Sequence, residues 1–259
     1  MKESISVTAL GQLKQAELTF GDITVLVGPQ ASGKSILLQC IKLVMDVGDI
    51  TQTLEEYGYN WYGNLANFLS LYFGEGMQRI WRTETQVFVD QRVFDIEMAL
   101  APSEKKKRES LFLIPAQRVM TLKNGWPRPF ADYEIGDPYV VKKFSEHLRR
   151  LMETELGSGK GAMFPQEGRM NEVIRNALPH SVFSGAEVKL DESGMRKRIV
   201  LNIENHQLPY MVWSAGQRES IPLLMGLYWL MPATDISKKK DVDWVVIEEP
   251  EDEFQHPQC

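Results

Sequence analysis

Hydrophobic residues alternate with polar ones at the start of the chain, and this pattern predicts strands. Residues 4–10 and 15–20 both alternate in this way, and a turn at Gly11 favours a hairpin. Residues 23–27 are almost continuously apolar, which is typical of a strand buried on both faces. From about Ser35 the apolar residues recur at helical spacing, so we expect a helix to follow the third strand.

The same two periodicities predict the remaining elements. Further strands are expected in 78–100 (two, joined near Asp90 and Gln91), 111–114, 186–193, 197–204 and 206–213 (with a turn at Asn205 and His206), and 243–251. Helices are expected over part of 51–76, over 138–156 and over 217–231, and polar linkers over 102–110 and 157–170. Strands and helices mixed in this order predict an α/β fold.

Composition narrows the class of protein. The 259 residues are 43% hydrophobic, enough for a sizeable core, and the net charge of −6 gives no general attraction to nucleic acid. Any contact with DNA would therefore be local, and the short basic clusters are also typical of solvated turns. Cys40 and Cys259 fit neither a disulfide framework nor a zinc site. With no leader or membrane-spanning run recognised, we expect a cytoplasmic protein without a membrane partner.

A phosphate-binding loop follows the third predicted strand. It matches the pattern G-x-x-x-x-G-K-[ST] in full and comprises Gly28, Pro29, Gln30, Ala31, Ser32, Gly33, Lys34 and Ser35. The glycines allow the backbone to approach phosphate closely, and the helix N-terminus adds partial positive charge. Lys34 is expected to reach the β- and γ-phosphates of ATP, and Ser35 to bind Mg²⁺. A similar run at Gly157 lacks the first glycine and is interpreted as a loop.

The last predicted strand ends in carboxylates. Glu248 and Glu249 follow the apolar residues 245–247, as in the Walker B arrangement. We expect Glu248 to hold Mg²⁺ and Glu249 to polarise the attacking water as the catalytic residue. Strands often end in acidic loops, so the complete phosphate-binding loop is what makes this interpretation strong.

A third motif precedes the apolar helix at 217–231. Ser214 is a candidate N-cap, and Ser214, Gly216 and Gln217 together could form an anion site at the helix N-terminus. An ordinary capped core helix would have the same residues. The spacing favours the functional interpretation, because Gly216 lies 32 residues before Glu248 and the order is phosphate loop, long insertion, S-x-G-Q turn and acidic strand.

These motifs resemble the soluble AAA-family ATPases of the ATP-binding-cassette superfamily. That group includes recombination-repair and chromosome-maintenance ATPases, overcoming-lysogenization-defect nucleases and ATPase subunits of phage-defence systems. The resemblance covers the start of the chain and about its last fifty residues, and 50–110 and 120–185 match only in outline. It implies an ATP-binding-cassette-type head with an N-terminal antiparallel β layer and a helical insertion.

The resemblance also implies roles for particular residues. Two heads bind two ATP molecules between them, so Ser214 and Gly216 would act on the nucleotide of the partner head. Gln117 would be the Q-loop residue near Mg²⁺, although a surface loop residue is the alternative. The neighbouring Arg118 could contact phosphate or pair with an acid.

The chain departs from the family at several points. Gln30 replaces the commoner asparagine, and Glu248 stands where many members have aspartate. His256 lies too close to the acidic strand to be the switch histidine. The family's last strands are therefore expected to be missing, and nucleotide binding should survive better than hydrolysis. The 97 positions from Gln117 to Ser214 are too few for a long coiled-coil arm.

Together these observations predict one truncated ATPase head over 1–259. It would comprise a phosphate-loop core at 1–48, an insertion at 49–212 with the Q-loop near 115–118, and the signature helix and acidic strand at 213–259. We expect it to form a homodimer on MgATP and to drive a nuclease, another protein partner or bound DNA, in repair or phage defence. The alternatives are a hydrolytically silent nucleotide-binding module and, from another class, a transporter ATPase subunit.

Overall fold

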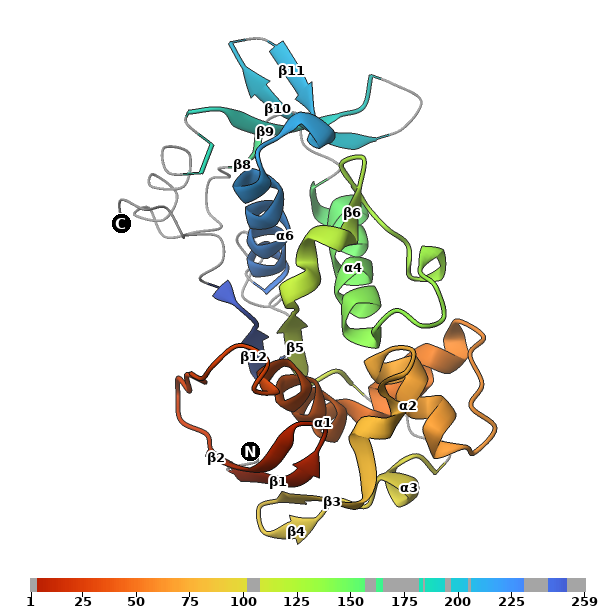
Figure 1. Cartoon of the computed structure of the whole chain (residues 1–259). Helices are drawn as coiled ribbons and strands as arrows, with labels where there is room; N and C mark the ends of the chain where they lie inside the picture. Colours follow the sequence, from red (N-terminus) through yellow and green to blue (C-terminus); the bar gives the residue numbers. More distant parts are fainter. Residues whose placement is uncertain are drawn as a thin grey trace. The chain divides into compact units, whose positions relative to one another are not determined.

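The computed structural model describes residues 4–101, 108–156, 162–164, 182–183, 185–193, 197–204, 206–230 and 242–250. The chain divides into two compact units (Figure 1). The first unit comprises 1–113, 134–140 and 242–248, and the second comprises 114–133, 141–241 and 249–259. No helix in the described ranges is long and apolar enough to span a bilayer.

The first unit contains a four-stranded antiparallel sheet in the order β2-β1-β3-β4. Its strands are β1 (Ser4–Leu10), β2 (Leu13–Thr19), β3 (Trp81–Val89) and β4 (Arg92–Val93). Val7 lies opposite Ala16 on one side and Val87 on the other. The register of β1 and β3 shifts between Thr8 and Leu10, next to Ala9 at a φ of 53°. This bulge turns Leu10 inward, so that it is buried like Val7 despite the odd spacing.

Helices complete the first unit. They are α1 (Lys34–Glu56), α2 (Leu65–Phe73), η1 (Met77–Ile80) and α3 (Ile96–Ala99). Asn64 caps α2, because its side chain accepts a hydrogen bond from Asn67 N. An aromatic stack forms the core beside α2, with the Tyr72 ring 6.1 Å from Phe68 and 5.6 Å from Tyr139. These rings hold α2 to the segment that enters the next helix.

Two short strands form a separate ladder. β5 (Leu111–Ile114) is buried throughout and pairs with β12 (Trp244–Ile247). The amides of Asp243 and Trp244 both donate to Ser110 O, so the strands start side by side and run in the same direction. β12 is only half buried, since Val245 is 48% and Ile247 36% exposed.

The second unit contains another four-stranded antiparallel sheet, in the order β11-β10-β9-β8. Its strands are β8 (Ala162–Phe164), β9 (Glu187–Asp191), β10 (Arg198–Ile203) and β11 (His206–Pro209). The small hairpin of β6 (Leu122–Lys123) and β7 (Trp126–Pro127) follows η2 (Ala116–Thr121).

Two helices form the core of the second unit. They are α4 (Tyr139–Leu151), continued by the π-helical turn η4 (Met152–Leu156), and α6 (Ala215–Leu230). A Cβ added to Gly226 of α6 would lie 3.0 Å from Phe144 of α4, so the glycine permits close approach of the two helices. The rings of His147 and Trp229 lie 5.1 Å apart, also between α4 and α6.

Most of the predicted elements are confirmed, and the chain is a mixed α/β protein with antiparallel sheets. The hairpin at Gly11, the strand pair joined at Asp90, the strand at 111–114, the meander and both long helices lie where the pattern predicts. The proposed boundary at 48/49 falls inside α1. The predicted loop at 157–170 lies mostly outside the described residues, and His256 and Cys259 lie wholly outside them.

One predicted strand is wrong. Residues 23–27 form no strand, and Ile23, Val25 and Val27 are 86%, 74% and 91% exposed. A strand requires a neighbour for its backbone N–H and C=O groups. Among the described residues no strand pairs with 23–27. The ring of Phe20 does reach β12, 4.9 Å from the Trp244 ring, and the chain beyond Phe20 continues without pairing.

Candidate functional site

The phosphate-binding loop leads directly into α1. Gly33 is the N-cap residue at a φ of 93°, a conformation that side chains disfavour, and Lys34 is the first helical residue. A Cβ on Gly33 would also lie 3.0 Å from Leu13 Cγ in β2. Glycine is therefore required here twice, by the backbone angle and by the hairpin that packs against it.

The Lys34 side chain closes the loop on itself. Its Nζ donates to Gly28 O at 2.7 Å and to Pro29 O at 2.8 Å. Ala31 has a φ of 59°, and a Cβ on Gly28 would lie 3.4 Å from Ser32 Oγ. Gln30 and Ala31 are exposed. The loop thus turns tightly around one ammonium group, and its tip faces solvent.

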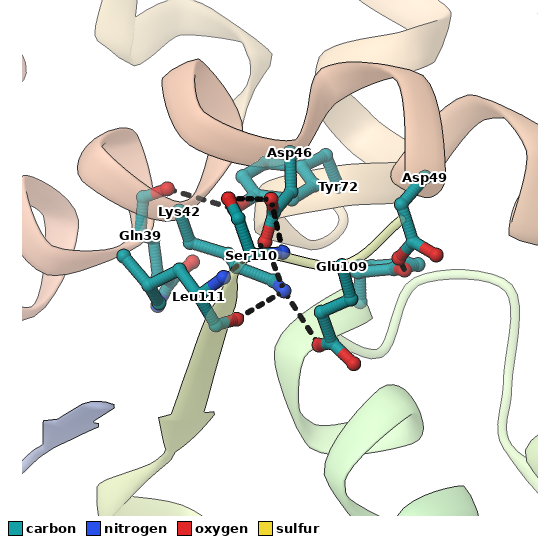
Figure 2. Close-up of polar contacts among 9 residues, drawn as sticks. Gln39, Lys42, Asp46, Asp49, Tyr72, Glu109, Ser110 and Leu111 are labelled. Atoms are coloured by element: carbon teal, nitrogen blue, oxygen red, sulfur yellow. Dashed lines mark hydrogen bonds and ion pairs between the residues drawn. The ribbon is translucent and has the colours of Figure 1, made fainter. Parts of the chain in front are cut away.

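A buried polar cluster anchors α1 behind the loop (Figure 2). Lys42 is 1% exposed, and its Nζ lies 2.8 Å from Asp46 Oδ2, 2.6 Å from Glu109 Oε1 and 2.6 Å from Leu111 O. Asp46 in turn accepts hydrogen bonds from Ser110 N at 2.8 Å and from Leu111 N at 2.9 Å. Figure 2 shows these groups between α1 and the start of β5.

The cluster keeps Lys42 protonated and places a bend in α1. Burial lowers the pKa of Lys42, but the carboxylates of Glu109 and Asp46 outweigh burial and raise the pKa above its usual value. Asp46 leaves helical geometry, with a φ of −128°, at the point where it turns to β5. The helix therefore bends where its aspartate receives the backbone amides of another segment.

The acidic strand end is divided between the two units. Glu248 follows β12 in the first unit and is 3% exposed. Glu249 has a φ of 47°, and its backbone carbonyl accepts a hydrogen bond from Arg118 Nη2 at 3.0 Å within the second unit. The chain thus turns sharply after the carboxylate that we expect to bind the metal.

The two candidate residues of the Q-loop differ in environment. Gln117 is exposed and lies in η2 with a ψ of 23°, outside helical geometry. Arg118 is 2% exposed, and its Nη1 reaches Pro115 O at 3.4 Å. Arg118 therefore contacts the backbone carbonyls of Pro115 and Glu249, whereas the side chain of Gln117 is exposed.

The S-x-G-Q turn forms a reciprocal cap at the start of α6. Gln217 N donates to Ser214 Oγ at 3.3 Å, and Ser214 N donates to Gln217 Oε1 at 3.1 Å. The predicted N-cap role of Ser214 is confirmed. A Cβ on Gly216 would meet nothing within 4 Å, so any requirement for glycine there would come from a ligand or partner rather than from the described chain.

The proline inside α6 leaves a backbone carbonyl without its helical donor, and a side chain supplies a replacement. Pro222 lacks the N–H that would bind Arg218 O, four residues earlier. Tyr210 OH donates to that carbonyl at 3.1 Å. Burial is the main reason that the pKa of Tyr210 rises to about 12, and the nearby Arg218 opposes this shift while Glu219 adds to it. The S-x-G-Q helix is therefore tied to the end of β11.

The predicted site residues thus fall into two described groups. The loop from Gly28 to Ser35 and Glu248 belong to the first unit, and Gln117, Ser214, Gly216, Gln217 and Glu249 belong to the second. No group of three or more His, Cys, Asp or Glu side chains suited to a metal occurs in the described ranges. The Mg²⁺ ligands that the sequence predicts are Ser35, Glu248 and Gln117, together with nucleotide oxygens.

Comparison with protein-family models and with curated proteins finds no match for this chain.

Sequence reasoning missed three features that have recognisable signals. The i,i+4 pair of Lys42 and Asp46 lies on the buried face of α1, where a charge pair indicates a fixed partner. Asn124 and Gly125 form the dipeptide most typical of a tight hairpin turn. Pro222 inside an apolar helix signals that the carbonyl of Arg218 needs another donor.

Proposed function

We propose that this chain is an ATP-binding and ATP-hydrolysing head of the ATP-binding-cassette type, with a P-loop NTPase fold. The single observation that carries the proposal is the loop from Gly28 to Ser35. Its sequence is complete, Gly33 has the left-handed backbone angle, and Lys34 starts α1 with its ammonium group on the loop carbonyls. Backbone amides at a helix N-terminus, together with a lysine, suit the phosphates of a nucleotide.

The residues present fit MgATP. In the proposed complex Lys34 exchanges the carbonyls of Gly28 and Pro29 for phosphate oxygens, and Ser35 and Glu248 hold the metal. Bound Mg²⁺ would supply charge neutralisation on the β- and γ-phosphates. Glu249 would orient and deprotonate the attacking water, and Gln117 would be the Q-loop residue near the metal that the resemblance implies.

The exposed start of α6 supports the proposed homodimer. Ser214 is exposed, and open space adjoins Gly216. A phosphate of the partner's nucleotide would approach the first-turn amides of a 16-residue helix, where partial positive charge is available. A nuclease or other protein partner and a role in repair or phage defence belong to this proposal by resemblance, and a cytoplasmic location belongs to it as the sequence predicts.

A second candidate is a nucleotide-binding module without turnover. The unpaired segment 23–27 favours it, because the loop is then not backed by a buried strand. A loosely held loop can bind phosphate, but catalysis requires groups fixed to within about 0.5 Å.

Calorimetry of MgATP with the wild type and with Lys34→Ala tests binding. We expect the variant to lose affinity at least about 100-fold, since a charge-assisted phosphate contact is removed. Lys14→Ala is the matched control, because this exposed lysine of β2 lies outside the loop. Equal affinity of the wild type and Lys34→Ala would overturn the proposal.

Turnover and assembly separate the two candidates. Glu249→Gln should keep binding and accumulate an ATP-dependent dimer, as measured by light scattering, if the chain is an ATPase head. Wild-type binding without phosphate release would support the silent module instead.

A further inference from the structure

A groove of about 860 Å³ lies wholly within the second unit, and none of its lining residues is one assigned to nucleotide. Its charged and aromatic lining residues include Lys123, Trp126, Arg128, Lys197, Arg198 and Tyr210. Four of these are cations, and among the described lining residues Asp132 is the one acidic residue. A positive groove is unexpected on a chain with a net charge of −6.

One wall of the groove is a hairpin that packs tightly against the sheet. Asn124 and Gly125, at φ values of 54° and 79°, form the turn between β6 and β7. Ile199 N of β10 donates to Gly125 O at 2.8 Å, and a Cβ on Gly125 would lie 2.7 Å from Ile199 O. The turn is therefore pressed against β10, and the hairpin and the sheet form two walls.

The base of the hairpin is fixed from α4. Arg128 N donates to Thr121 O at 2.9 Å across the hairpin. The hydroxyl of Ser145, which is fully buried, lies 3.0 Å from Thr121 O and 2.7 Å from Arg128 O. These contacts fix the backbone from which the groove's side chains project.

The cations differ in how much of their charge is already compensated. Lys123 is exposed and has no ion pair among the described residues. Lys197 meets Glu192 at 2.6 Å, but both side chains are about half exposed, and such pairs are weak and screened by salt. Arg198 meets Asp191 at 3.1 Å. The guanidinium of Arg128 lies 3.8 Å from the centroid of the Tyr133 ring and donates to Asp132 O at 2.9 Å, so these contacts hold it in place.

We propose that this groove binds a single strand of nucleic acid. Exposed cations on two walls suit the repeated phosphates of a strand, whereas a small-molecule site uses a few convergent, buried polar groups. Trp126 is half-buried in the groove wall, so part of its ring can stack on a base. An acidic peptide would use the cations but not this stacking surface, and double-stranded DNA would not present its base faces.

The inference concerns the partner of the proposed ATPase head but does not require nucleotide. Binding of the strand is measured without ATP, and loss of ATP binding in Lys34→Ala is measured without the strand. Failure of either proposal therefore leaves the other standing.

Fluorescence anisotropy of the full chain with a labelled oligothymidylate of about 20 nucleotides tests the inference. We expect binding that weakens at least tenfold between about 50 and 200 mM salt. Lys123→Glu and Lys197→Glu should each weaken it about tenfold, and Lys14→Glu, with the same charge change outside the groove, should change it less than about twofold. Trp126→Ala should cost about tenfold with little effect on the salt dependence.

Two further measurements make the outcome decisive. Circular dichroism and a urea titration of each variant show whether it is folded, and Trp126→Phe should restore most of the affinity lost in Trp126→Ala. Equal weakening by Lys14→Glu would overturn the site. Equal competition by polyglutamate of matched charge, or by duplex DNA, would overturn the single-strand assignment.

Discussion

The hydroxyl of Tyr210 donates a hydrogen bond to the backbone carbonyl of Arg218, 3.1 Å away. Pro222 deprives that carbonyl of its helical partner, so the side chain replaces a missing backbone donor. Tyr210→Phe should therefore destabilise the fold by about 1–2 kcal/mol, because a buried acceptor loses its donor. Urea unfolding at neutral pH measures this loss.

The proline itself offers the control. In a Pro222→Ala background the alanine N–H can bind Arg218 O, so Tyr210→Phe should then cost less than about 0.5 kcal/mol. An equal cost in both backgrounds would mean that the tyrosine acts through packing alone.

The same tyrosine predicts a dependence of stability on alkaline pH. Its folded-state pKa, about 12, lies above its usual value near 10, so folding favours the protonated phenol. This contribution is complete below pH 10 and is lost as the pH rises from about 10 to 12. The difference in unfolding free energy between the wild type and Tyr210→Phe should shrink over that range, by at most about 1.4 kcal/mol per pH unit. A constant difference from pH 9 to 11.5 would contradict the assignment.

The buried Lys42 cluster should be sensitive to loss of one charge. Lys42→Met leaves Asp46 and Glu109 without their shared cation, and we expect a loss of about 3–5 kcal/mol in unfolding free energy. Glu153→Gln is the matched control, since its i,i+4 pair with Arg149 is partly exposed and should be worth about 0.3–0.5 kcal/mol. Similar losses for both variants would show that the buried cluster contributes no more than a surface pair.

The S-x-G-Q turn allows stability and function to be separated. Ser214→Ala should cost about 1 kcal/mol, because it removes the cap of α6. Gly216→Ala should leave stability unchanged or slightly higher, since its Cβ meets no atom. If Gly216 faces the partner's nucleotide, Gly216→Ala should nevertheless abolish ATP-dependent dimerisation in light scattering. A dimer that forms normally would argue against that role.

The sequence predicted elements whose causes are local. The Gly11 turn, the alternation in β1 and the Ser214 cap all depend on residues within a few positions of one another, and each is present. The chemical identity of the phosphate loop is equally local, because its pattern requires only eight consecutive residues.

The features that the sequence did not predict depend on residues that are far apart in the chain. Residues 23–27 have the composition of a buried strand, but strand formation also requires a second segment to pair with, which the composition of 23–27 cannot reveal. The kink at Asp46 likewise depends on the amides of Ser110 and Leu111, which no helical pattern in α1 can reveal. Single-residue signals such as Pro222 show that a compensating group is needed without showing which residue provides it.

Leu13 packs where a side chain on Gly33 would have to be, and the turn at Gly11 lies against Ile36 and Ile80. The N-terminal hairpin is thus a template against which the phosphate loop takes its shape. Substitution of Leu13 by a bulky or polar residue should therefore weaken ATP binding as substitutions in the loop do, although Leu13 lies outside the motif. The residues that shape this loop therefore extend beyond its eight-residue motif to Leu13.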